Sequence, residues 1–115
     1  DKGDVFVFPE KFNGLSLPIQ EACAAGMPVM CTYRRPFSEW LPTEIMVPPS
    51  GSKRSRISHA YREFDEAIVE PKVIAQTVDD WYGQDITHLS EWGIAWGECH
   101  SWEKLKERYL ELLRG

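Results

Sequence analysis

The chain has 115 residues, of which 43% are hydrophobic and 27% are charged, and its formal net charge is -5. This length corresponds to one globular domain or to a part of one. The acidic balance argues against a protein that coats nucleic acid, because such proteins need a basic surface. We therefore expect no nucleic-acid partner and only a local site for any anion.

The cysteines indicate a reducing compartment. Cys23, Cys31 and Cys99 show no CxxC spacing, and an odd number in this arrangement fits a cytoplasmic protein better than a disulfide framework. No metal-binding pattern occurs, so we expect neither a metal nor another cofactor. No apolar run reaches the length of a membrane span, so peripheral membrane contact would come only through the full-length protein. The chain begins without Met and soon enters an apolar run, which suggests a fragment of a longer protein.

The first elements predict a βαβ unit. Residues 5–8, Val-Phe-Val-Phe, form an apolar run typical of a strand buried on both faces, and residues 29–32 form a second candidate strand. Between them we expect a helix over residues 18–25, which Gly26 would end. Two parallel strands joined by a helix place the first loop at the carboxyl end of the first strand, where open α/β sheets bind ligands.

The loop before this helix is a candidate anion site. Leu17 can act as the N-cap and Pro18 can take the first helical position. A helix N-terminus preceded by a loop with Gly14 and Ser16 is a natural cradle for phosphate. The buried face of the helix would be formed by three residues at i, i+3, i+4 spacing: Ile19, Ala22 and Cys23. Glu21 should then lie on the first turn, exposed to solvent and turned toward the loop.

The remaining elements complete an α/β fold, with a three-stranded parallel sheet flanked by helices. A short helical turn at residues 37–41 precedes a third parallel strand at residues 45–47. Residues 50–67 show little apolar periodicity and predict a solvated basic loop. Its cationic residues could contact phosphate, although such charge runs usually mean only solubility: Lys53, Arg54 and Arg56. Three helices are expected in the second half, over residues 71–82, 86–96 and 102–113.

No catalytic constellation stands out from spacing alone. Ser16 lies outside a GxSxG elbow, and both a Rossmann GxGxxG and a Walker lysine are absent. The histidines His59, His88 and His100 lie near no HExxH or paired-cysteine pattern. A helix-cap role is the favoured interpretation for His100.

Residues 4–32, DVFVFPEKFNGLSLPIQEACAAGMPVMCT, resemble the C-terminal domain of retaining GT-B glycosyltransferases of the glycosyltransferase family 4 type. The family pattern is roughly a strand followed by EGFGLPxxEAxAxGxPV. The residues that match it in register include Leu17, Pro18, Glu21, Ala22, Gly26, Pro28 and Val29. Residues 101–113 also resemble the family's final SWE-containing helix. The resemblance implies that residues 1–115 form a single partial domain, the second half of a Rossmann-like nucleotide-sugar-binding domain.

The resemblance assigns roles to individual residues. Glu21 falls on the family's second glutamate, which accepts hydrogen bonds from the ribose hydroxyls of the nucleotide. Asn13 falls on the first glutamate and departs from the pattern, since an amide brings no negative charge to a developing oxocarbenium ion. Glu39 resembles the family's glutamate after the second strand, without its usual glycines. The loop that approaches the donor sugar and diphosphate would consist of Gly14, Leu15, Ser16 and Leu17. Ser16 replaces a glycine of the family pattern.

The implied activity is metal-independent transfer of a sugar from a nucleotide-diphosphate donor to an unknown acceptor. Its partners would be the donor and an upstream part of the same protein, because a GT-B active site is a cleft between two domains. The chain alone would be inactive. An apolar stripe of Trp102, Leu105, Tyr109 and Leu112 should stay exposed here, since the family's last helix packs partly on the other domain, and self-association is possible. The alternative is a non-catalytic Rossmann-like nucleotide-binding or assembly module, and a nucleic-acid binder ranks third.

Overall fold

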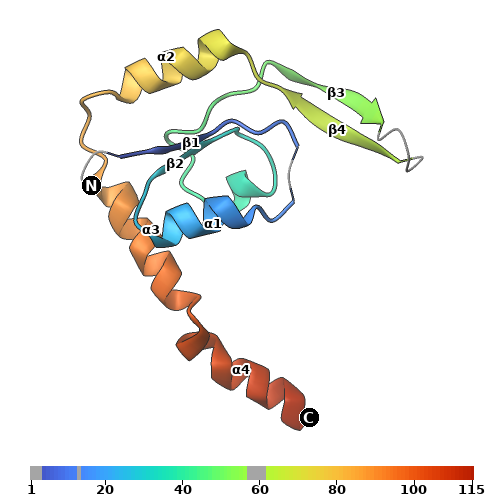
Figure 1. Ribbon diagram of the computed structural model, residues 1–115, viewed down its shortest axis with the longest axis vertical. Helices are drawn as coiled ribbons and strands as arrows, with labels where there is room; N and C mark the ends of the chain where they lie inside the picture. The colour runs from blue at the N-terminus through green and yellow to red at the C-terminus, as the bar shows by residue number, and fades with distance from the viewer. Residues whose placement is uncertain (1–3, 13, 57–61) are drawn as a thin grey trace.

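The computed structural model describes residues 4–12, 14–56 and 62–115. The protein is a mixed α/β chain with a small two-stranded parallel sheet, a second two-stranded antiparallel sheet, and helices (Figure 1). Its elements in order are β1 (Phe6–Phe8), α1 (Leu17–Ala24), β2 (Val29–Cys31), the 3-10 helix η1 (Phe37–Glu39), β3 (Gly51–Arg56), β4 (Glu63–Ile68), α2 (Pro71–Trp81), α3 (Thr87–Cys99) and α4 (Trp102–Arg114).

The predicted βαβ unit is present. β1 and β2 pair in parallel, with Phe6 opposite Val29, and the backbone N–H of Phe6 donates to the carbonyl oxygen of Pro28 at 2.9 Å. α1 makes the crossover between them (Figure 1). The loop from β1 to α1 therefore lies at the carboxyl end of β1, as the sequence predicts.

The prediction of a third parallel strand at residues 45–47 is wrong, because this segment forms only one bridge to the sheet. Val47 makes one isolated parallel bridge to Thr32, in which the backbone N–H of Val47 donates to Cys31 and that of Tyr33 donates to Val47, both at 2.8 Å. The N–H of Met46 instead bonds the carbonyl of Thr43 at 3.2 Å, so the chain turns just before it reaches the sheet edge.

Alternating residues of β2 separate two hydrophobic clusters. Val29 and Cys31 belong to the cluster beneath α1, whereas Met30 belongs to the cluster on the opposite face. This alternation follows from the period of two in a strand. Helix α1 contributes Ile19, Ala22 and Cys23 to the first cluster, together with Trp92 and Trp96 of α3 packed against it. Helix α2 packs on the second cluster through Val73, Ile74 and Trp81.

Glycines allow α1 and α3 to approach closely. A Cβ at Gly93 would lie 2.4 Å from the carbonyl oxygen of Cys23, and one at Gly97 would lie 2.9 Å from the Cβ of Ala24. The two glycines thus serve packing and do not end the helix. α3 continues to Cys99, past the end predicted at residue 96. Gly26 ends α1 as expected: its φ is 79°, and the N–H of Met27 reaches back to the carbonyl of Ala22 at 3.0 Å.

The segment predicted as a loop at residues 50–67 contains the β3–β4 hairpin. Its register places Lys53 opposite Glu66, Arg54 opposite Asp65 and Arg56 opposite Glu63. Opposite charges that face each other across two strands stabilise a hairpin, even where the strands lack alternating apolar residues. The loop prediction is therefore wrong, because it relied on apolar periodicity alone.

Helix α4 leaves most of its predicted apolar stripe in solvent, although Leu105 is half-buried. No residue of α4 is buried, and the exposed fractions are 76% for Trp102, 50% for Tyr109 and 78% for Leu112. Figure 1 shows α4 at the far end of the chain, away from both sheets. Ser101 occupies the N-cap position, where its carbonyl accepts from the N–H of Leu105 at 3.0 Å while its side chain makes no cap hydrogen bond.

Candidate functional site

The loop from β1 enters α1 through a left-handed residue. Ser16 is the N-cap, with φ 49° and ψ 85°, and α1 begins at Leu17. The prediction that Leu17 is the cap and Pro18 the first helical residue is therefore wrong by one position. The N–H of Gln20 closes the first turn on the carbonyl of Ser16 at 3.2 Å. A positive φ favours glycine, which is the residue that the family pattern carries at this position.

The Ser16 side chain is buried without a hydrogen bond. The residue is 7% exposed, and its hydroxyl has no partner among the described residues. Native proteins rarely leave a buried hydroxyl unpaired, so each such group needs an explanation. Its place directly before the unpaired N–H groups of α1 makes it a candidate donor to a ligand bound there.

Glu21 is exposed, as predicted, but it lies one residue further from the start of the helix than expected, just past the first turn. The first turn of α1 contains no acidic residue, because the helix begins at Leu17. The buried face of α1 is the predicted one and leaves Glu21 in solvent. Its carboxylate is thus available to a ligand without any change in the core.

The other predicted loop residues are open to solvent. Leu15 is 76% exposed and Leu17 is 67% exposed, and a Cβ at Gly14 would meet no atom within 4 Å. The side chain of Gln20 donates from Nε2 to the carbonyl of Leu15 at 2.9 Å, which ties this loop to the helix. Asn13 lies outside the described residues.

Glu39 is engaged elsewhere. It ends η1, and its Oε1 accepts from Nε of Arg35 at 3.0 Å in an exposed i, i+4 ion pair. The carboxylate thus has a partner within its own turn of helix. Its predicted resemblance to a family glutamate stays a prediction.

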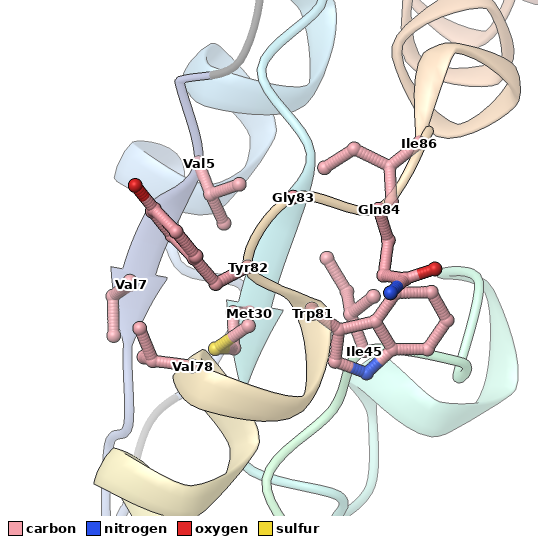
Figure 2. A pocket seen from close by; sticks show the side chains of 10 residues that line it. All are labelled: Val5, Val7, Met30, Ile45, Val78, Trp81, Tyr82, Gly83, Gln84 and Ile86. Carbon is pink, nitrogen blue, oxygen red and sulfur yellow. The ribbon is translucent and has the colours of Figure 1, made fainter.

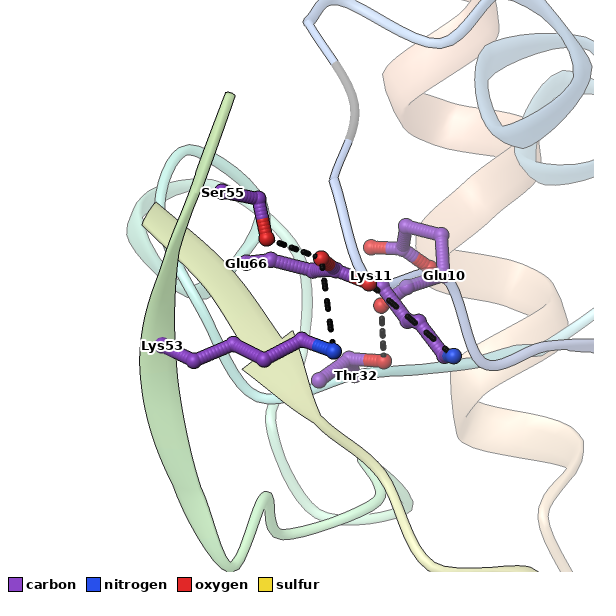
Figure 3. A network of polar contacts seen from close by, with 6 residues as sticks. All are labelled: Glu10, Lys11, Thr32, Lys53, Ser55 and Glu66. Carbon is purple, nitrogen blue, oxygen red and sulfur yellow. Dashed lines mark hydrogen bonds and ion pairs between the residues drawn. The ribbon is translucent and has the colours of Figure 1, made fainter. Parts of the chain in front are cut away.

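Glu10 is a candidate site residue that the sequence prediction missed. It follows β1, its side chain is only 6% exposed, and neither carboxylate oxygen has a hydrogen-bond partner among the residues described. Its nearest recorded cation is Arg34, whose Nη1 lies 4.0 Å from Oε1. The hydroxyl of Thr32 donates to the backbone carbonyl of Glu10 at 2.6 Å (Figure 3). The signal available in the sequence was a charged residue almost directly after a buried strand.

Burial raises the pKa of the Glu10 carboxyl group above its usual value. The backbone amides of Glu10 and Thr32 and the Arg34 guanidinium oppose part of this shift, although none of the described amides is aligned for a hydrogen bond to the carboxylate. Thr32 and Arg34 come from the end of β2, so the carboxyl ends of both parallel strands meet at this polar cluster.

An apolar cavity lies on the sheet face that α2 covers, away from the loop. It has a volume of about 520 Å³ and is open to solvent. Figure 2 shows that its lining side chains are mostly aliphatic or aromatic: Val5, Val7, Met30, Ile45, Val78, Trp81, Tyr82, Gly83, Gln84 and Ile86. None of these residues belongs to the predicted site, and an uncharged apolar lining does not suit a diphosphate.

Two buried thiols lie in the core beneath α1. Burial raises the pKa of Cys23 to about 11 and that of Cys31 to about 12, and the nearby Glu10 carboxylate contributes to the shift at Cys31. Both therefore remain neutral thiols at physiological pH and are unsuited to nucleophilic chemistry. All three cysteines are free.

The basic residues of the hairpin are matched by acidic partners. Nζ of Lys53 lies 3.8 Å from Glu66, and Arg54 lies within 3.6 Å of Glu63 and 3.5 Å of Asp65. These pairs weaken the interpretation of the hairpin as a phosphate-binding or nucleic-acid-binding patch, because the positive charge is compensated locally.

Within residues 4–12, 14–56 and 62–115, no group of three or more His, Cys, Asp or Glu side chains is placed to hold a metal ion. His88 pairs with Glu44 at 3.0 Å, and Nδ1 of His100 lies 2.8 Å from the carbonyl oxygen of Trp96, beside the end of α3. No helix there combines the length and the apolar character needed to cross a bilayer.

Comparison with known proteins identifies no relative. No family model matches the chain, and no curated protein or solved structure matches it either. The fold and the site define an α/β chain whose exposed helix carboxylate and glycine-containing loop lie after the first of two parallel strands.

Proposed function

We propose that this chain is the C-terminal part of a retaining GT-B glycosyltransferase, which binds a nucleotide-diphosphate sugar and transfers the sugar to an acceptor. The observation that carries the proposal is the motif from Asn13 to Val29, whose matched residues resemble the family pattern in register. The parallel β1–α1–β2 unit supports it, because this arrangement puts the motif loop at the ligand-binding edge of an α/β sheet.

In this proposal Glu21 accepts hydrogen bonds from two ribose hydroxyls, for which an ionised carboxylate is well matched. The N–H groups at the start of α1, preceded by Gly14, Leu15 and Ser16, receive the diphosphate. Two observations support these roles: Glu21 is exposed on α1, and the Ser16 hydroxyl has no hydrogen-bond partner in the described part of the chain. No metal is required by this chemistry.

The rest of the active site would come from an upstream part of the same protein. The exposed stripe of α4 supports this idea, because large apolar surfaces in solvent are characteristic of contact sites. An isolated chain would then bind donor weakly and transfer no sugar.

A second candidate function is a nucleotide-binding module without catalytic activity. It is favoured by Asn13, since an amide at this position supplies no negative charge to the reacting sugar. A thermal-shift screen of the full-length protein against UDP-, GDP- and ADP-sugars, followed by a sugar-transfer assay with the donor that binds, separates the two. Binding with transfer supports the enzyme, binding without transfer supports the module, and no binding contradicts both.

A further inference from the structure

A set of contacts joins the β3–β4 hairpin to the loop that leads into α1. The backbone N–H of Ala67 in β4 donates to the carbonyl of Lys11 at 2.8 Å. The ring of Phe12 packs against the ring of Phe64, with centroids 4.3 Å apart and planes inclined by 48°. The two residues that precede position 13 are therefore both in contact with β4.

Glu66 strengthens this junction from within the hairpin. Its carboxylate accepts a hydrogen bond from the hydroxyl of Ser55 at 2.5 Å and lies 3.8 Å from Nζ of Lys53, both on β3. It also lies 3.9 Å from Nζ of Lys11, as Figure 3 shows. The hydrogen bond from Ser55 lowers the pKa of Glu66, so the carboxylate is ionised at neutral pH. One side chain thus connects both strands with the loop.

Beyond Phe12, the described loop residues Gly14 and Leu15 are loosely packed. The space around Gly14 is open, and the Leu15 side chain is 76% exposed, although its carbonyl accepts from Nε2 of Gln20. A glycine in open space has wide conformational freedom, so a ligand that needs one loop conformation must order this segment on binding. Contacts that order the loop in advance reduce that entropic cost.

We propose that the β3–β4 hairpin is a positioning element for the donor site. It holds Lys11 and Phe12, the described residues at the start of the loop, and so reduces the number of conformations open to the loop that receives the nucleotide sugar. Phe64 is the central positioning residue, because it supplies the ring on which Phe12 packs. This inference rests on the proposed function, since the loop is the proposed donor-binding loop.

The experiment compares variants of the full-length protein. Phe64→Ala removes the ring contact from the hairpin side, and Phe12→Ala removes it from the loop side in case the first variant fails to fold. Phe64→Tyr keeps the ring, and Ser52→Ala changes an exposed residue of the same hairpin. Thermal unfolding and circular dichroism establish that each variant is folded.

The first measurement is amide hydrogen exchange in peptides covering residues 9–17. An aromatic pair of this kind contributes a free energy that corresponds to about a 2- to 13-fold change in an opening equilibrium. We expect the loop to exchange faster by this factor in both alanine variants, and at the wild-type rate in Phe64→Tyr and Ser52→Ala. Unchanged exchange in Phe64→Ala and Phe12→Ala overturns the positioning role, even where the wild-type protein binds a donor.

The second measurement is affinity for UDP-, GDP- and ADP-glucose. The donor that binds the wild type should bind Phe64→Ala more weakly by a similar factor, because the competent loop conformation is less populated. Equal affinity in the two proteins overturns the proposal. A wild-type protein that binds none of the three overturns the proposed function itself, and the exchange data show separately whether the hairpin holds the loop.

Discussion

Replacing Glu21 by alanine should weaken donor binding without unfolding the protein. Glu21 is exposed on α1, whereas the buried face of this helix consists of Ile19, Ala22 and Cys23, which the substitution leaves unchanged. Alanine is also the better helix former, so the free energy of unfolding should change by no more than about 0.5 kcal/mol. A charged acceptor that holds two hydroxyls contributes about 1.5–3 kcal/mol, which corresponds to about 10- to 150-fold in affinity.

The assay is ligand-induced stabilisation of the full-length protein. At a donor concentration 100 times its dissociation constant, the wild type gains about 2.7 kcal/mol. At the same concentration, the same relation gives the Glu21→Ala protein a gain of about 0.3–1.4 kcal/mol. Glu98→Ala, which removes an exposed carboxylate from α3, is the matched control and should keep the full wild-type gain.

One result would refute this reasoning. If Glu21→Ala unfolds the domain while the remaining folded fraction keeps its nucleotide affinity, the carboxylate stabilises α1 and does not bind the donor. The assignment of α1 to the donor site would then be wrong.

Four further variants test other parts of the structure. Asn13→Glu, which restores negative charge near the reacting carbon, should raise turnover in a sugar-transfer assay if transfer is the activity; unchanged turnover argues for the non-catalytic module. Ser16→Gly relieves a positive φ of 49° and should raise the free energy of unfolding by about 1 kcal/mol in denaturant titration, whereas a loss contradicts the strain. Glu10→Gln tests burial. The folded protein raises the pKa of Glu10, so it favours the protonated carboxyl group. The free energy of unfolding of the wild type should therefore fall as the pH rises from the ordinary glutamate pKa through the higher pKa of the folded protein. This fall should be absent in the variant. Leu112→Lys should reduce self-association in analytical ultracentrifugation at unchanged melting temperature, because the side chain is 78% exposed.

The βαβ unit could be predicted from the sequence because its signals are local. An apolar run such as residues 5–8 identifies a buried strand wherever the chain places it, and Gly26 with Pro28 marks the end of a helix by backbone geometry alone. The exposed stripe of α4 was also predictable, since its spacing is visible along one helix. These features need no knowledge of residues distant in the chain.

The hairpin and the buried carboxylate depend on distant partners. Lys53 and Glu66 stabilise β3–β4 only in the register that places them opposite each other, and neither residue alone favours a strand. Similarly, Glu10 resembles a solvated residue after a strand until the end of β2 brings Thr32 and Arg34 beside it. Apolar periodicity carries no information about either pairing.

Two side chains with unsatisfied buried oxygens lie beside the proposed site. Glu10 lies near the start of the β1–α1 loop and Ser16 at its end, and the buried side-chain oxygens of both have no hydrogen-bond partner among the described residues. Each such group costs about 1–3 kcal/mol, and Ser16 adds a positive φ. Violations of local rules in native proteins concentrate at functional and strained sites. The hairpin contacts at Lys11 and Phe12 support the start of the same loop, and a ligand-binding loop needs such support if its flanking residues are to keep costly local conformations.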